Sequence, residues 1–364
     1  MFAARLVVLL VLALAARTAA AQTRDAAWAA ALAPGQTAML PAGNYRGPWK
    51  LGPRVHLVAS PGATLEGGDP VLTIAGDGVT LEGLAVRALP GAVGIRALGA
   101  TGTELIDVHV TGGARNLSVK GGSISIRGGT FEHSSKFGLW LQGCHAAMSS
   151  LVVAHHLGPA IYLGHSSVDL SRATIVDAEY GLLAFGAQLD MQDSHVEQIG
   201  RAAVGAIVSA ARIRRSEFTG PFSEAALSIS GSHPIVLQGN HIRLTGRTGI
   251  KLINSIATMS DNDISGARSD AQGLEGDGLY SNNASVDSTG DRWSDNGGVS
   301  ISIMGGSAVL RGCHIAGAGQ AAAAVTSQGE LRLSKCEISE GSMELMVAPD
   351  AQLTQEPAPG TPVH

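Results

Sequence analysis

Short runs with apolar residues at alternate positions recur along the chain at a spacing of about 22 residues, which is typical of repeat proteins. One run reads small-apolar-x-apolar, as in Gly-Leu-Trp-Leu at 138–141. A second run, apolar-x-x-small-x-apolar, follows in the same rhythm, as at 237–242 and 259–264. Gly, Ser, Asn or Asp separates the runs, so the pattern predicts short strands and turns rather than helices.

The first apolar position of the first run is Ile, Leu or Val in every repeat, at 95, 117, 139, 161, 182, 204, 227, 250, 279, 301, 325 and 345. A unit of this length cannot bury its apolar face alone. Stacking the units in parallel register, about 4.8 Å apart, buries a continuous core and pairs the backbone of each strand. The sequence therefore predicts an all-β parallel β-helix of about twelve coils. A leucine-rich repeat has a similar period, but its Leu-x-x-Leu-x-Leu-x-x-Asn signature does not recur here.

The ends of the solenoid and one of its turns carry further signals. Residues 25–32 read as a short helix containing Trp28 that caps the open core, and the first strand follows at 40–45. Asn240 and Asn262 occupy the same small, inward position on adjacent coils. We expect them to form an amide ladder inside the turn, with a structural role.

The rungs Gly-Ile-x-Leu and Ile-x-x-Asn-x-Ile resemble those of right-handed parallel β-helix proteins of the pectin-lyase-like superfamily. The resemblance covers residues 35–355 and is specific for the fold. For function it implies only an interaction with carbohydrate, because carbohydrate-active members bind substrate along the first parallel sheet and the loops that lead into it. The Asp-Pro-His-Asp motif of the mannuronan epimerases in this group is missing here.

Composition and charge narrow the class of partner. The 364 residues are 45% hydrophobic, 4% aromatic and 15% charged, with a net charge of −5 and no Lys/Arg run, which argues against nucleic-acid binding. The N-terminus resembles a secretory signal peptide that is cut after Ala21, with Arg5 followed by the apolar run 6–16. An uncleaved membrane anchor is the alternative. No later segment is long and apolar enough to span a membrane. We therefore expect a secreted or periplasmic protein, divided into a signal peptide (1–21), a cap and first strand (22–54), the β-helix (55–354) and a disordered tail (355–364).

The outward residues of the first sheet can be read from the repeat as Arg96, Ser118, Trp140, Tyr162, Leu183, Gly205, Ser228, Lys251, Tyr280, Ser302 and Thr326. None is Asp or Glu. A glycoside hydrolase of the usual type needs two carboxylates that flank the scissile bond, so this face disfavours that mechanism. Arg96, Trp140, Tyr162 and Tyr280 are instead candidates for contacting a glycan.

Three polar residues at the turn before the first sheet share the repeat spacing. His133, His155 and Asp177 are 22 residues apart and should stack on successive coils, beside Trp140 and Tyr162. Two imidazoles and a carboxylate in a stack suit a divalent metal or acid–base catalysis, and an aromatic pair suits stacking on sugar rings. The alternative is that turn positions simply favour polar residues.

One coil has a long segment, residues 265–278, next to Lys251 and Tyr280. Its acidic residues are Asp270, Glu275 and Asp277. They suit a divalent cation such as Ca²⁺ that would hold a uronate, with Lys251 as the base of a β-elimination. The alternative is a Gly-rich surface loop with solvated charges.

The cysteines add one structural possibility. Cys313 and Cys336 occupy the same position on adjacent coils, within disulfide range, and export permits oxidation. Two stacked reduced thiols remain the alternative. Three scattered cysteines, with Cys144 unmatched, exclude a zinc ribbon.

These observations predict an exported β-helix that interacts with a polysaccharide or a cell-surface glycan by binding. A polysaccharide lyase or epimerase acting on a uronate polymer is the enzymatic alternative, and a non-catalytic scaffold is the third.

Overall fold

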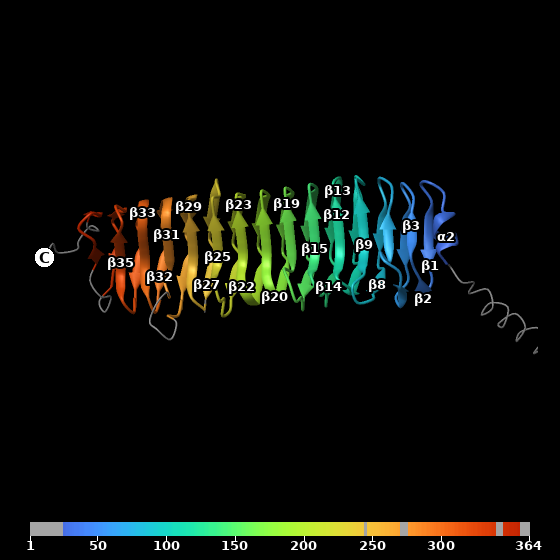
Figure 1. Ribbon diagram of the computed structural model, residues 1–364, viewed down its shortest axis with the longest axis horizontal. Helices are drawn as coiled ribbons and strands as arrows, with labels where there is room; N and C mark the ends of the chain where they lie inside the picture. Colours follow the sequence, from blue (N-terminus) through green and yellow to red (C-terminus); the bar gives the residue numbers. More distant parts are fainter. Residues whose placement is uncertain (1–24, 244–245, 270–275, 340–344, 357–364) are drawn as a thin grey trace, which may run out of the picture.

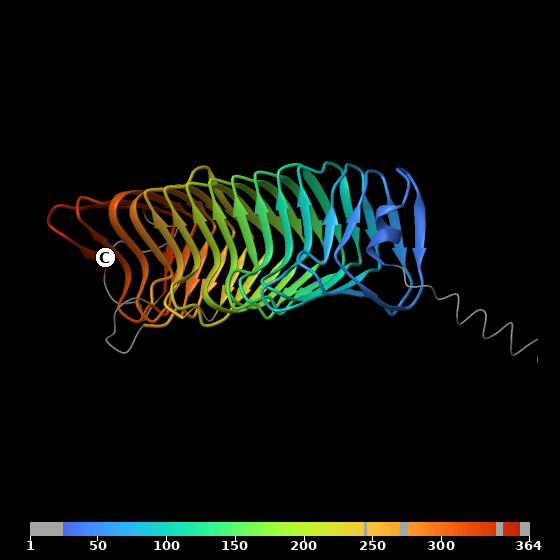
Figure 2. The ribbon, with the colours of Figure 1, turned by 45° about the vertical axis from the view of Figure 1, so that its right-hand side comes forward.

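The computed structural model describes residues 25–243, 246–269, 276–339 and 345–356. The chain winds into a straight solenoid of parallel strands, with the N-terminal helix at one end and the last strands at the other (Figure 1). The predicted parallel β-helix is confirmed. Figure 2 shows the coils stacked along one axis, each coil crossing from one sheet to the next.

Three parallel sheets run along the solenoid. The first sheet contains β3 (Trp49–Leu51), β6 (Leu72–Ile74), β9 (Val93–Leu98), β12 (Arg115–Lys120), β15 (Phe137–Gln142), β18 (Ile161–Gly164), the second halves of β20 (Thr174–Phe185) and β22 (His195–Ile207), β25 (Ala225–Ser230), β28 (Thr248–Ile253), the first parts of β31 (Leu279–Thr289) and β33 (Val299–Arg311), β35 (Ala321–Thr326) and β38 (Met346–Val347).

The second sheet contains β1 (Thr37–Leu40), β4 (His56–Ala59), β7 (Thr80–Glu82), β10 (Thr103–Ile106), β13 (Ser123–Arg127), β16 (His145–Ser149), β19 (Ser167–Ser171), β21 (Gln188–Gln192), β23 (Ala210–Arg214), β26 (Ile235–Gln238), β29 (Ile256–Ser260), the second parts of β31 and β33, β36 (Glu330–Ser334) and β39 (Gln352–Glu356). The third sheet contains β2 (Gly43–Arg46), β5 (Ala63–Glu66), β8 (Ala85–Ala88), β11 (His109–Gly112), β14 (Thr130–Glu132), β17 (Val152–Ala154), the first halves of β20 and β22, β24 (Glu217–Thr219), β27 (His241–Arg243), β30 (Asp263–Ser265), β32 (Arg292–Ser294), β34 (His314–Ala316) and β37 (Glu337–Ile338).

The solenoid has about fourteen turns instead of the predicted twelve. Additional coils precede Ile95, because Leu72 pairs with Ile95 and Trp49 pairs with Leu72 in the same parallel register. These first coils lack the Gly-Ile-x-Leu signature from which the coils were counted. Parallel pairing starts still earlier, where β1 pairs with β4.

The predicted register of the first sheet was wrong on one late coil. Ile301 pairs with Ala323 and Ser302 with Ala324, so Val325 and Thr326 lie two residues further along the strand than expected. The cause is the Ala321–Ala324 run, which offers no branched apolar residue at the matching position. At the C-terminus, Gln355 and Glu356 of the predicted tail lie in β39, and the remainder lies outside the described residues.

Alternation along each strand builds the core. The inward rows of Leu, Ile, Val and Ala are almost fully buried, together with large side chains such as Trp49, Phe131, Phe218 and Trp293. The turn between the second and third sheets carries the predicted amide ladder. Asn240 donates through Nδ2 to Oδ1 of Asn262 at 2.9 Å, and Asn262 donates in the same way to Asp291 at 2.8 Å. The ladder thus satisfies polar groups inside an apolar coil.

Specific contacts stabilise the regions near both ends of the solenoid. The helix α2 (Ala26–Ala30) is capped by Asp25, which accepts a hydrogen bond from the backbone N–H of Trp28 at 3.0 Å. The Trp28 ring packs 5.5 Å from that of Trp49 and covers the N-terminal end of the core. Near the other end, a disulfide joins Cys313 to Cys336. No helix among the described residues is long and apolar enough to cross a membrane.

Candidate functional site

The turn from the third sheet to the first sheet places the two histidines and the aspartate. His133 follows β14, His155 follows β17, and Asp177 lies at the matching point of β20. All three have left-handed backbone conformations, with φ of 59°, 61° and 53°. The equal coil lengths and the repeated backbone shape bring the three side chains into one column.

These three side chains interact in pairs on the surface. Nδ1 of His155 lies 2.9 Å from Oδ2 of Asp177, and the two side chains are 48% and 60% exposed. The His133 ring stacks on that of His155, with centroids 5.0 Å apart and planes 11° apart. The described part of the chain holds no group of three or more His, Cys, Asp or Glu residues arranged to bind a metal. The geometry places a His–Asp pair beside a second, stacked histidine ring.

His156 lies directly beneath this column and is buried. Its Nε2–H donates to the carbonyl oxygen of Phe131 at 3.0 Å, and its Nδ1 accepts from the Ser134 hydroxyl at 2.7 Å. Burial, with smaller contributions from the neighbouring His133 and His155, lowers the pKa of His156 to about 4. His156 is thus a neutral structural residue that supports the turn.

Four residues on the adjoining face of the first sheet form a surface that we call the aromatic strip: Arg115, Phe137, Trp140 and Tyr162. The rings of Trp140 and Tyr162 are parallel to within 7°, with centroids 6.4 Å apart. Phe137 packs 5.5 Å from Tyr162. The Arg115 guanidinium lies 4.7 Å from the Trp140 centroid and 5.6 Å from that of Phe137. Two of these residues, Arg115 and Phe137, were missed by sequence reasoning because they lie three positions before the predicted outward row.

The other candidates lie outside this strip. Arg96 lies on β9, the strand next to β12, and makes a long ion pair of 3.9 Å with Asp69. Lys251 and Tyr280 are neighbours on β28 and β31, and the Tyr280 hydroxyl contacts the Met304 sulfur at 3.6 Å.

The acidic segment 265–278 is only partly described. Asp277 accepts a hydrogen bond from the backbone N–H of Val299 at 2.9 Å. Asp270 and Glu275 lie outside the described residues.

Sequence reasoning missed a groove on the second sheet, which consists of three adjoining hollows of about 230, 400 and 290 Å³. They extend from β10 to β26, and the outward Asp169 lines all three. Asp190, its neighbour on β21, lines two of them. We call this surface the second-sheet groove.

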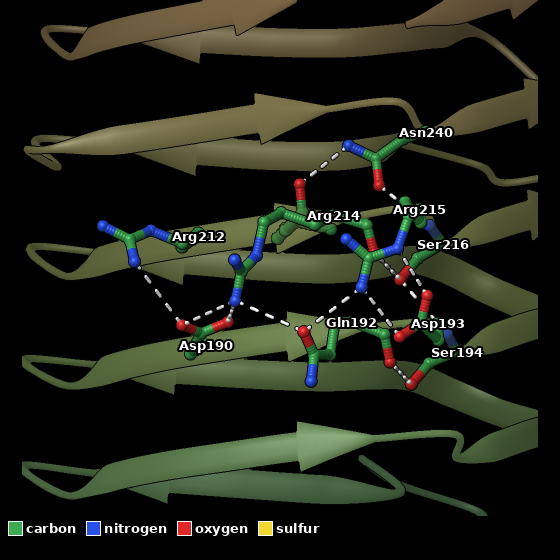
Figure 3. Close-up of polar contacts among 10 residues, drawn as sticks. Asp190, Gln192, Asp193, Ser194, Arg212, Arg214, Arg215, Ser216 and Asn240 are labelled. Atoms are coloured by element: carbon green, nitrogen blue, oxygen red, sulfur yellow. Dashed lines mark hydrogen bonds and ion pairs between the residues drawn. The ribbon is translucent and has the colours of Figure 1, made fainter.

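Ion pairs hold most of the charges of the second-sheet groove in place (Figure 3). Arg214 donates to both oxygens of Asp190 at 2.9 and 3.2 Å, and to Oε1 of Gln192 at 3.3 Å. Just beyond the groove, Arg215 binds Asp193 at 2.7 Å and lowers the pKa of that carboxyl group. These contacts fix the polar atoms at one side of the groove.

A known protein family is similar in sequence to about half of the chain. The family described as "right handed beta helix region" matches residues 159–338. This match agrees with the parallel β-helix architecture of the structure. No curated protein shows significant sequence similarity to the chain.

Several solved structures are similar to this β-helix. A mannuronic acid specific polysaccharide family 6 lyase from human gut microbiota is 13% identical, with a TM-score of 0.47, and the match covers 85% of this chain and 79% of the lyase. The tailspike protein 3 of bacteriophage CBA120 is 11% identical, with a TM-score of 0.49 and coverage of 90% and 57%. A periplasmic alginate epimerase is 11% identical, with a TM-score of 0.38 and coverage of 89% and 79%. At these identities the similarity concerns the fold alone.

Proposed function

We propose that the protein is an exported β-helix that binds an acidic polysaccharide along its first sheet, with the aromatic strip as the contact surface. The observation that carries this proposal is the position of Arg115. Its guanidinium stacks 4.7 Å from the Trp140 ring centroid, and no carboxylate within the described residues lies at ion-pair distance from it. Its positive charge is therefore available to a ligand.

The stacked arrangement suits a sugar carboxylate. A guanidinium that lies over an aromatic face keeps its N–H groups in its own plane, where they can donate to both oxygens of a carboxylate. The rings also hold the guanidinium in one orientation, so less side-chain entropy is lost on binding. Trp140 and Tyr162 add rigid, half-exposed contact area to this charge.

The surroundings of Arg115 add positive charge. Lys120 is exposed at the end of the same strand, and Arg96 lies on the strand before it. These basic groups lie on two adjacent coils, with Arg96 also 3.9 Å from Asp69, and together they suit an anionic polymer. Such binding should weaken as salt rises, because exposed charges are screened.

Affinity gel electrophoresis and titration calorimetry with polygalacturonate and with alginate test this proposal. We expect Arg115→Gln to weaken binding about tenfold, a loss of about 1.4 kcal/mol. The affinity of Arg115→Lys should lie between those of the unaltered protein and Arg115→Gln, because lysine keeps the charge and loses the planar stacking. Trp140→Ala should weaken binding by a similar factor.

Arg292→Gln is the matched control, because Arg292 is an exposed arginine of the third sheet, away from the strip. It should bind as the unaltered protein does. Unchanged affinity in both Arg115→Gln and Trp140→Ala at low salt would refute the aromatic strip as the binding surface.

A second candidate function, lyase or epimerase action on a uronate, is favoured by the His155–Asp177 pair alone. Asp177 accepts the Nδ1–H of His155 at 2.9 Å, so Nε2 is left to accept a proton from a substrate carbon. Formation of unsaturated uronate, followed by ultraviolet absorbance, would establish elimination. Activity that persists in His155→Gln would exclude this pair as the base.

A further inference from the structure

We infer that the second-sheet groove is a separate saccharide site, which binds a neutral, hydroxyl-rich chain lying along the solenoid axis. This inference does not depend on the proposed binding at the aromatic strip, because the two surfaces lie on different sheets. The juxtaposition that carries it is the series of three hollows that meet at Asp169.

The shape of the groove follows from the residues on its floor. Two neighbouring outward positions are small, Ser125 on β13 and Ala147 on β16, and the same row continues with Asp169, Asp190 and Arg212. Larger side chains border them, including Arg127 and Arg214. The hollows cross seven strands, from β10 to β26, which at the usual strand spacing is about 29 Å. An extended chain that follows the axis fits this length, whereas a compact ligand would fill only one hollow.

The charges of the groove give an acidic chain no net attraction. Arg214 is bound to Asp190, and Arg127 pairs with Glu104 at 3.4 Å. Within the described residues, Asp169 has no ion-pair partner and is exposed. Arg212 also lines the groove and lies 3.8 Å from Asp190, which already binds Arg214, so its positive charge offsets that of Asp169. The formal charges of the lining therefore balance, and a uronate or phosphate polymer gains no net attraction there, whereas a neutral chain needs none.

The hydrogen-bonding groups of the groove match hydroxyls. A carboxylate accepts several hydrogen bonds, so Asp169 can accept from two neighbouring hydroxyls of one sugar. Ser123, Ser125 and Ser167 both donate and accept. The oriented Asp190–Arg214 pair presents acceptor and donor atoms side by side (Figure 3). The lining contains no Phe, Trp or Tyr side chain, so recognition here rests on hydrogen bonds and shape.

Titration of the full chain with soluble neutral glucans of α and β linkage, and with alginate as the acidic probe, tests the inference. Ala147→Trp places a large side chain on the groove floor and should reduce affinity for a neutral glucan at least tenfold. Asp169→Asn keeps the shape of the groove and removes the charge, and should reduce the affinity for a neutral glucan about fivefold. Thr258→Trp is the matched control, because Thr258 is exposed on β29 of the same sheet, outside the hollows.

Three results would overturn this inference. The first is unchanged binding of a neutral glucan by a folded Ala147→Trp, checked by circular dichroism. The second is a groove that binds alginate and none of the neutral glucans. The third is a protein that binds only a cationic glucosamine polymer and loses this binding in Asp169→Asn, because the groove would then recognise positive charge and not hydroxyl groups. Loss of alginate binding in Arg115→Gln concerns the aromatic strip and leaves this test unaffected.

Discussion

Asp291 provides a direct test of the electrostatics inside the coil. Its side chain is fully buried at the end of the amide ladder. The carboxylate accepts from Ser288 Oγ at 2.6 Å and from Asn262 Nδ2 at 2.8 Å. Burial nevertheless raises its pKa from 3.8 to about 6, because these hydrogen bonds do not fully replace the water that the charged form loses.

The raised pKa makes the free energy of unfolding depend on pH. Between about pH 4 and pH 6 the folded protein holds a proton on Asp291 that the unfolded chain has already released. The stabilisation is therefore complete below the unfolded pKa and is lost as the pH rises through the folded pKa. A shift of about two units corresponds to about 3 kcal/mol. Asp291→Asn removes this dependence and extends the ladder with a third amide.

At pH 7 we expect Asp291→Asn to raise the free energy of unfolding by about 2 kcal/mol. This figure is the 3 kcal/mol above less about 1 kcal/mol for the altered hydrogen bond with Ser288. Urea unfolding followed by circular dichroism, repeated from pH 4 to pH 7, measures both quantities. Asp169→Asn, which changes an exposed aspartate, is the control and should shift neither. The same pH dependence in Asp291→Asn and in the unaltered protein would refute the reasoning.

Three further predictions concern stability. His156→Gln should make the free energy of unfolding less dependent on pH below 6.5. Because the pKa of His156 is about 4 in the folded protein, the unaltered protein loses about 3 kcal/mol of that free energy as the pH falls from 6.5 to 4. The same loss in the variant would contradict this prediction. Reduction of the Cys313–Cys336 disulfide, which spans 23 residues, should cost about 3 kcal/mol by the loop-entropy relation, and an unfolding midpoint in urea that does not move with reductant would show that the bond carries no such stabilisation. Asn262→Ala should cost about 2 to 4 kcal/mol because it leaves buried ladder partners unsatisfied, whereas a loss below 1 kcal/mol would mean that the ladder relaxes.

The regular part of the fold could be predicted because each coil repeats one apolar pattern. Leu139 and Ile161 are paired residues on neighbouring strands, and their spacing alone placed them there. The prediction failed where packing outweighed the pattern. Trp49 and Leu72 extend the same column without the small residue before them that marked the other coils. Ala323 fills its position with a side chain too small to be recognised as a core residue.

The candidate site was predictable only where a rare residue type repeats at the coil spacing. Histidine at 133 and 155 is such a signal, and the rings do stack. The second-sheet groove offers no such signal, because Ser125, Ala147 and Asp169 look like ordinary exposed strand residues. Its shape arises from small side chains that are neighbours across strands and not along the chain. Reading the outward column of the second sheet, as was done for the first, would have placed Asp169 beside Asp190.

The arrangement of the two surfaces follows from the geometry of one coil. His133, Trp140 and Ala147 lie close together in sequence, yet they belong to the turn, the first sheet and the second sheet of a single coil. Neighbouring coils repeat this division, so the same stretch of solenoid supplies both the aromatic strip and the second-sheet groove. Within the described residues, Arg115 on one face and Asp169 on the other have no ion-pair partner. Because the core separates the two sheets, each face can change its outward residues without altering the inward rows that hold the coil together.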